Sequence, residues 1–160
     1  MHFFKWLGVF LLFLTGALTG ISLLTFERRR VTQAEGFLSL LRFFRWQIDA
    51  LAEPIPQILA DCDATVLSAC GWQESARPAT LDALLGGVTL YLSEDICRLL
   101  YDFAGSLGTV YREEQLRGCD YHLARLSPYC EKLRQELPKR ERMALFLPIA
   151  AALCLILLLL

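Results

Sequence analysis

Residues 99–126 read LLYDFAGSLGTVYREEQLRGCDYHLARL and decide how the rest of the chain is organised. Their first part has apolar residues three or four positions apart, as on one face of an amphipathic helix: Leu99, Leu100, Phe103 and Leu107. Gly105 and Gly108 interrupt this pattern, and glycine can take the left-handed conformation that ends a helix. Glu113 and Glu114 then suit the first turns of a second helix, where acidic side chains favour the dipole. The stretch therefore predicts two helices joined by a tight turn at Gly105 and Gly108.

The second helix of this hairpin is expected to run from about Val110 to Glu136. Its buried stripe is expected to contain Leu116, either Cys119 or Tyr121, Leu123 and Leu126. Pro138 follows shortly afterwards and is expected to break or kink the helix, because proline removes a backbone donor.

Composition points to membrane segments, since 55% of the 160 residues are apolar. The net charge of −1 gives no reason to expect nucleic-acid binding. No two cysteines have CxxC spacing and the chain has two histidines, so we expect no metal. We also expect no cofactor. We interpret the cysteines as small buried hydrophobic residues: Cys62, Cys70, Cys97, Cys119, Cys130 and Cys154.

Two uncharged runs, 7–26 and 143–160, are long enough to span a bilayer as helices. A cleaved signal peptide is the alternative for the first run, but a charged Glu27-Arg28-Arg29-Arg30 follows it instead of a small-x-small cleavage site. We therefore expect a retained anchor over 1–26 and a C-terminal transmembrane helix over 142–160. Gly16 and Gly20 form a GxxxG pattern, which predicts close packing between transmembrane helices.

The basic side chains that flank both runs lie on the segment between them: Arg28, Arg29, Arg30, Lys132, Arg134, Lys139, Arg140 and Arg142. The positive-inside rule therefore predicts that residues 27–141 face the cytoplasm and that both chain ends lie on the other side. A reducing cytoplasm also agrees with unpaired cysteines.

The segment 27–141 is long enough for one small domain, and its patterns predict a bundle of about five helices in an all-α fold. The first helix carries an apolar stripe and ends near Pro54 and Pro56: Phe37, Leu40, Leu41, Phe44, Ile48 and Leu51. A short second helix is expected around Ile55, Ile58 and Leu59, followed by a loop over 71–78. Thr80 is expected to cap a helix that closes at Gly86-Gly87, and Ser93 to precede the helix of the hairpin. The strand-like run 88–92 has no partner strand and is interpreted as a loop or helix entry.

Catalytic motifs are absent from the sequence: it contains no P-loop, GxSxG, HExxH or Rossmann glycine pattern. His122 could serve as a base in a membrane-anchored enzyme, although a histidine at the surface or the edge of the core explains it better. Phe43, Phe44 and Trp46 are bulky enough to form either core packing or a contact with a protein or membrane surface.

Several features occur in a fixed order along the chain. An arginine-rich entry at 28–30 precedes the proline-punctuated Glu53-Pro54-Ile55-Pro56. Phe103-Ala104-Gly105-Ser106-Leu107-Gly108 follows, with Gln115 seven residues on, and the chain ends in a leucine-rich run. This ordered set resembles the stage III sporulation protein AB family over nearly the full length. Two positions depart from the family pattern, namely Tyr111 in place of an acidic residue and Phe146-Leu147-Pro148-Ile149 in place of a glycine-containing entry.

The resemblance implies a membrane scaffold similar to the F-domain platform proteins of type II secretion machines. It implies a non-enzymatic protein of the outer forespore membrane, whose helical bundle faces the mother-cell cytoplasm. The implied partners are a cytoplasmic secretion-type ATPase, other small membrane proteins of the same complex, the bilayer and a second copy of the chain. As ATPase contacts we predict the charged residues at the start of the last helix: Arg112, Glu113, Glu114 and Arg117. The alternatives are a membrane-anchored enzyme that uses His122 and a generic two-span regulator.

Overall fold

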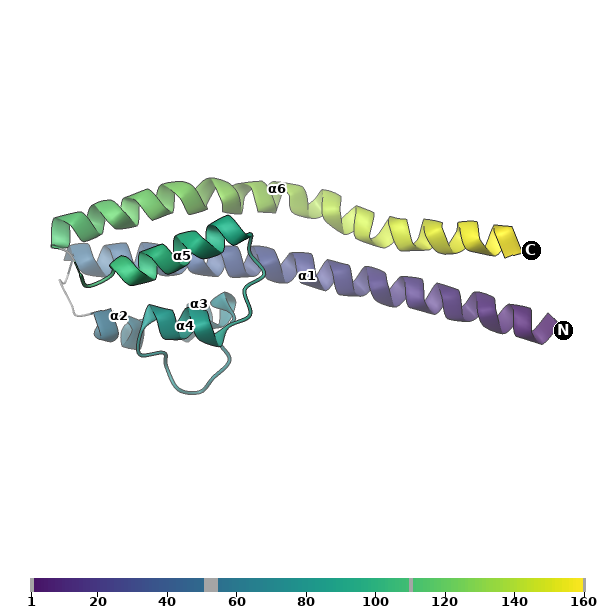
Figure 1. The fold of residues 1–160 in the computed structure, drawn as a ribbon, viewed down its shortest axis with the longest axis horizontal. Helices are drawn as coiled ribbons and strands as arrows, with labels where there is room; N and C mark the ends of the chain where they lie inside the picture. The colour runs from purple at the N-terminus through teal and green to yellow at the C-terminus, as the bar shows by residue number, and fades with distance from the viewer. Residues whose placement is uncertain (1, 51–54, 110, 160) are drawn as a thin grey trace. The chain divides into compact units, whose positions relative to one another are not determined.

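A computed structural model describes residues 2–50, 55–109 and 111–159, and these residues form helices and loops without a β-strand (Figure 1). The helices are α1 (His2–Ala50), α2 (Ile55–Asp61), α3 (Ala64–Cys70), α4 (Leu81–Gly87), α5 (Glu94–Ser106) and α6 (Arg112–Leu159). The all-α prediction is therefore confirmed. Leu51, Pro54 and Val110, which the sequence places at element ends, lie outside the described residues.

The chain divides into two compact units. The central unit contains residues 30–133, and the terminal unit contains residues 1–29 together with 134–160. The central unit lies inside the 27–141 range that the sequence predicts for the helical domain. Helices α1 and α6 each contribute one part to both units.

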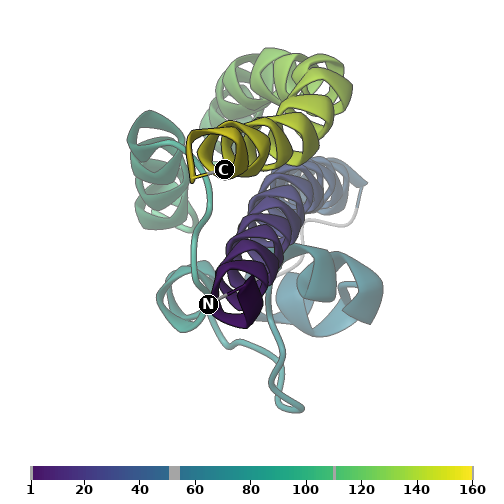
Figure 2. The same cartoon turned by 90° about the vertical axis from the view of Figure 1, so that its right-hand side faces the viewer.

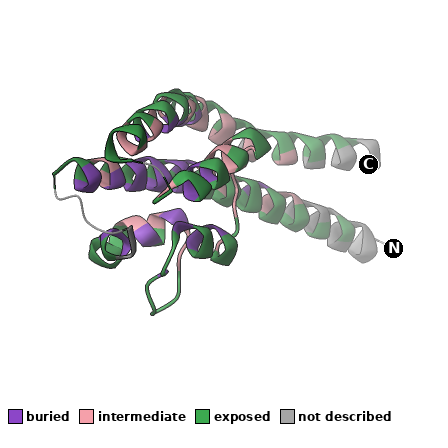
Figure 3. Ribbon diagram, turned by 60° about the vertical axis from the view of Figure 1, so that its left-hand side comes forward, coloured by how far each residue is buried: buried purple, intermediate pink, exposed green. Residues whose placement is uncertain are grey.

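The core of the central unit forms around α1, which lies between α6 on one side and the short helices α2 to α4 on the other (Figures 1 and 2). The stripe that the sequence predicts on α1 is buried, with Phe37, Leu40, Leu41 and Phe44 fully inaccessible to solvent. Buried residues of the other helices pack around this stripe, as the colouring of Figure 3 shows. Burial of this apolar surface is the main stabilising contribution to the unit.

Helix α3 is an element that was not predicted, because the sequence pattern indicates a single short helix in this region. Asp63 begins α3 as its N-cap, and its carboxylate accepts a hydrogen bond from the Thr65 N–H at 2.8 Å. Gly71 ends the helix with φ of 104°, which is the left-handed conformation of a C-terminal glycine. The residues that begin and end α3, Asp63 and Gly71, are visible in the sequence, but an Asp and a Gly on either side of seven residues predict a helix only weakly.

Helices α4 and α5 begin where the sequence predicts. The Thr80 hydroxyl accepts a hydrogen bond from the Ala83 N–H at 3.1 Å, so the predicted cap of α4 is confirmed. Ser93 precedes α5, but its side chain makes no capping hydrogen bond, and the acidic Glu94 and Asp95 occupy the first turn. The run 88–92 forms no strand, as expected.

The turn between α5 and α6 depends on one of the two predicted glycines. The Leu107 N–H donates to the carbonyl oxygens of Phe103 and Ala104, and Gly108 follows with φ of 79°. Gly108 therefore has the left-handed conformation that the sequence predicts. Gly105 lies inside α5, which continues one residue further to Ser106, so its assignment to the turn is wrong. Gly105 does not have a positive φ, and its backbone therefore remains helical.

Helix α6 is longer than predicted. It continues through Pro138 to Leu159 without the break that was one of the two expected outcomes. The Arg140 guanidinium binds the Glu136 carboxylate at 2.8 Å across this proline, and such an i,i+4 pair stabilises the turn that lost a hydrogen bond. The sequence leaves open whether Cys119 or Tyr121 belongs to the buried stripe of α6. Cys119 is buried and Tyr121 is 55% exposed, so Cys119 is the residue of the stripe.

The terminal unit consists of the first part of α1 and the last part of α6, which lie side by side and antiparallel (Figures 1 and 2). Gly20 is buried, and a Cβ atom at this position would lie 2.9 Å from the Ala144 carbonyl oxygen. Gly20 therefore lies at a close helix–helix contact, whereas Gly16 is half-buried. In the described part of the chain, no helix combines the length and the apolar character that crossing a membrane requires.

Candidate functional site

Arg112, the first residue of α6, ties this helix to the end of α1. Its Nε donates to the Ile48 carbonyl oxygen at 3.0 Å, and its Nη2 donates to the Asp49 carbonyl oxygen. The same Nη2 lies 3.6 Å from the Asp49 carboxylate. The last carbonyls of a helix lack intrahelical partners and carry partial negative charge, so a guanidinium satisfies them well. Arg112 thus has a structural role that its place in the sequence did not reveal.

The other three predicted contact residues lie exposed on the first turns of α6: Glu113, Glu114 and Arg117. We call these three residues the α6 charged face. One turn further on, Asp120 accepts a hydrogen bond from Arg45 of α1 at 2.5 Å, and this interaction raises the pKa of Arg45. The α6 charged face is therefore carried by a helix that two arginines fix to α1.

His122 is a buried residue of the core, 7% exposed. Its ring centroid lies 5.1 Å from that of Phe103 and 5.3 Å from that of Tyr121. Burial lowers the pKa of His122, and the nearby Asp102 opposes this effect. Its Nδ1 is buried and has no hydrogen-bond partner among the described residues.

The three aromatic residues of α1 do not form one surface. Phe44 is fully buried and makes an edge-to-face contact with Phe103, with ring centroids 6.2 Å apart. Phe43 is half-buried and Trp46 is 58% exposed. Core packing therefore explains Phe44, and Trp46 alone of the three is available to a partner.

The cysteines follow the predicted pattern for the most part. Cys62, Cys70, Cys119 and Cys130 are buried, Cys97 is half-buried and Cys154 is exposed. Burial raises the pKa of Cys119 and of Cys130 to about 11, which favours the protonated thiol at neutral pH. No group of three or more metal-binding side chains occurs among the described residues.

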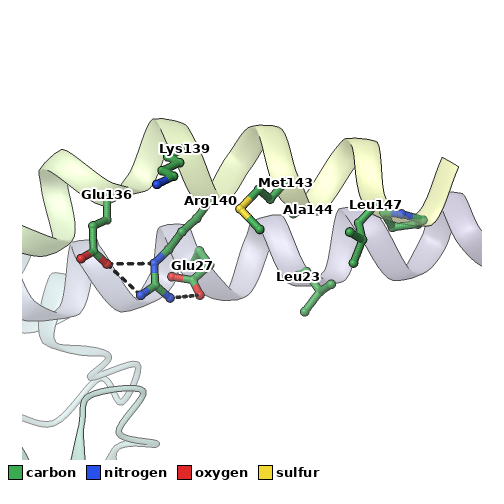
Figure 4. A pocket seen from close by; sticks show the side chains of 9 residues that line it. Leu23, Glu27, Glu136, Lys139, Arg140, Met143, Ala144 and Leu147 are labelled. Atoms are coloured by element: carbon green, nitrogen blue, oxygen red, sulfur yellow. Dashed lines mark hydrogen bonds and ion pairs between the residues drawn. The ribbon is translucent and has the colours of Figure 1, made fainter. Parts of the chain in front are cut away.

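A groove of about 540 Å³ lies between the two helices of the terminal unit (Figure 4). Its lining residues come from both helices: Leu23, Glu27, Glu136, Lys139, Arg140, Met143, Ala144, Leu147 and Pro148. In the sequence, Lys139 and Arg140 are recognisable only as charges that flank an apolar run. The groove is not predictable there, because Glu27 and Arg140, whose side chains meet in it, are 113 positions apart.

The described residues define an all-α protein in which a long first helix and a long last helix are joined by ion pairs and close packing. The family described as stage III sporulation protein AB matches this chain over residues 5–160, and the chain belongs to that family. A search of curated proteins and a search of solved structures gave no match. The resemblance to type II secretion platform proteins is not confirmed by these comparisons.

Proposed function

We propose that this sporulation protein is a non-enzymatic membrane scaffold with two spans, whose central unit docks a cytoplasmic secretion-type ATPase. Its membership of the stage III sporulation protein AB family supports the cellular process. The pairing of α1 and α6 in the terminal unit is the observation that carries the proposal. We place this hairpin in the outer forespore membrane, with the central unit on the mother-cell side, as the family resemblance implies.

The pairing of α1 and α6 brings the two uncharged runs of the sequence together. Gly20 permits close approach to Ala144 within the runs, and small residues serve this purpose between membrane helices. Ion pairs join the charged ends of the same helices, Glu27 to Arg140 at 3.1 Å and Arg28 to Glu141 at 2.7 Å. Charges at one end and apolar residues beyond it are the pattern of a helical hairpin that enters a bilayer.

The topology is tested by cysteine labelling in intact cells. Two single-cysteine variants, Ser75→Cys and Leu160→Cys, are made in a background without the native cysteines. Ser75 lies in the exposed loop between α3 and α4, and Leu160 is the last residue of the sequence. In non-sporulating cells that carry the protein in the plasma membrane, a membrane-impermeant maleimide should label residue 160 and should reach residue 75 only after the cells are permeabilised. Labelling of residue 75 in intact cells would show that the proposed topology is wrong.

Docking of the ATPase is assigned to the α6 charged face. Its side chains are exposed, and they project from a helix whose start is fixed by Arg112. Exposed charges at an interface contribute to association rate and specificity more than to affinity.

The docking proposal is tested with the double variant Glu113→Lys, Glu114→Lys in a pull-down with the candidate ATPase. Binding should weaken and its salt dependence should change. The matched control reverses Asp61 and Glu74, which are exposed acidic residues elsewhere on the central unit, and should bind normally. If the first variant binds as well as the control, the docking surface lies elsewhere and Trp46 becomes the next position to test.

The enzyme alternative is tested at His122. His122→Leu should support normal sporulation if the protein is a scaffold, because the residue then serves packing alone. A sporulation block by a folded and correctly assembled His122→Leu protein would instead favour a catalytic role.

A further inference from the structure

The groove in the terminal unit changes from charged to apolar along its length. Glu27, Glu136, Lys139 and Arg140 line one end, whereas Leu23, Met143, Ala144, Leu147 and Pro148 line the rest (Figure 4). The change occurs at the same level on both helices, since Glu27 follows the uncharged run of α1 and Met143 begins that of α6. A ligand that fits such a groove has a charged head and an apolar tail.

The carboxylates at the charged end are already paired. Arg140 binds Glu27 at 3.1 Å and Glu136 at 2.8 Å, and Arg28 binds Glu141 at 2.7 Å. Lys139 lines the groove, is exposed, and has no carboxylate within ion-pair distance in the described part of the chain. The charged end of the groove therefore presents an ammonium group whose counter-charge must come from a ligand or from solvent ions.

The surrounding charges also favour an anion. Residues 27–29 and 134–142 contain six basic and three acidic side chains. All three acidic side chains take part in the ion pairs with Arg28 and Arg140. Basic pockets between membrane helices on the cytoplasmic side are suited to anionic lipid headgroups.

We infer that this groove binds one anionic phospholipid, with the phosphate at Lys139 and an acyl chain along Leu23, Met143 and Leu147. The inference rests on the proposed membrane location and adds a defined lipid site to it. The lipid would fill the space between α1 and α6 and strengthen their pairing, since an acyl chain buries the apolar side chains that line the groove.

The test uses the full-length chain in a non-ionic detergent, titrated with phosphatidylglycerol and followed by native mass spectrometry. Lys139→Gln should weaken binding of one phosphatidylglycerol about fivefold, which corresponds to the loss of one basic side chain at an anionic headgroup. Arg142→Gln is the matched control. Arg142 lies three residues after Lys139 and does not line the groove, so this variant removes the same charge outside the groove. The control should bind phosphatidylglycerol like the wild type.

Two further arms identify the ligand. Phosphatidylcholine with the same acyl chains should bind more weakly than phosphatidylglycerol and should not respond to Lys139→Gln. Inorganic phosphate should not compete, because the apolar part of the groove contributes to lipid binding. Equal effects of Lys139→Gln and Arg142→Gln, equal binding of both lipids, or competition by phosphate would overturn the inference. The cysteine-labelling experiment decides the membrane topology separately, so a failure of the lipid site is distinguishable from a failure of the proposed function.

Discussion

The backbone N–H of Tyr91 donates a hydrogen bond to the side-chain oxygen of Gln33 at 2.7 Å. Gln33 is 2% exposed, and its Nε2 donates to the carbonyl oxygens of Cys70 and Thr89, each at 2.9 Å. One side chain of α1 therefore satisfies three backbone groups, one at the last residue of α3 and two in the loop between α4 and α5. Gln33 thus fixes both the end of α3 and this loop to α1.

Gln33→Met should destabilise the chain by about 2 kcal/mol, because it removes three hydrogen bonds of a buried side chain and leaves the buried Cys70 carbonyl without this partner, while nearly preserving the side-chain volume. The measurement is the free energy of unfolding of the purified full-length chain. Thr32→Met is the matched control at the neighbouring exposed position and should have little effect. Equal stability of the two variants would show that the three hydrogen bonds contribute nothing.

Gly36 permits close contact between α1 and α3. A Cβ atom at Gly36 would lie 2.7 Å from the backbone carbon of Ala69 and 2.8 Å from the Cys70 nitrogen. Gly36→Ala should therefore destabilise the chain by about 1–3 kcal/mol, since the obstructing atoms are backbone. Gly118→Ala in α6 meets nothing within 4 Å and should instead stabilise it slightly, because alanine favours helix. Thermal melting of both variants checks the opposite signs.

Gly108→Val should destabilise the turn between α5 and α6 by about 1–3 kcal/mol, because a β-branched residue tolerates a φ of 79° poorly. Gly105→Ala is the matched comparison three residues earlier. It lies inside α5 with nothing near its Cβ position, and it should gain about 0.5–1 kcal/mol. An unchanged melting temperature for Gly108→Val would contradict the assignment of Gly108 as the residue on which the turn depends.

The stability of the folded chain should depend on pH through His122. Burial lowers its pKa from the ordinary value of 6.5, so the unfolded chain takes up a proton at a higher pH than the folded chain does. The stability that His122 contributes in its neutral form is therefore complete above pH 6.5 and is lost as the pH falls toward the lowered pKa. Melting temperatures at about pH 7.5 and 5.5 should show a smaller decrease for His122→Leu than for the wild type.

The control for this pH dependence is His2→Gln, which removes the other histidine of the chain and should retain the wild-type behaviour. Parallel pH profiles for the wild type and His122→Leu would mean that another group is responsible.

Arg112→Gln should destabilise the chain by about 1 kcal/mol, because it removes charge-assisted hydrogen bonds to the last carbonyls of α1. Arg117→Gln, an exposed variant in the same helix, should leave stability unchanged. Unfolding by denaturant distinguishes the two. If both variants unfold alike, Arg112 belongs with the α6 charged face and has no structural role.

The sequence predicted the features of this chain that depend on neighbouring residues. The apolar stripe of α1 around Phe37 and Phe44 follows from helical periodicity, and the cap at Thr80 and the positive φ of Gly108 follow from local backbone chemistry. Each of these requires information from within a few turns of helix. The missed helix α3 shows the limit, because its two end signals at Asp63 and Gly71 are common in loops as well.

The tertiary structure alone decided which distant residues meet. Gln33 binds the backbone of a residue 58 positions away, and Arg140 binds a glutamate 113 positions away. Neither contact leaves a periodic pattern in the sequence, because a hydrogen bond between distant segments constrains one position on each. The same holds for the burial of His122 and for the groove at Lys139, which depend on how α1, α5 and α6 pack. Local propensity determines where a helix begins and ends, but the faces that touch are selected by packing of the whole unit.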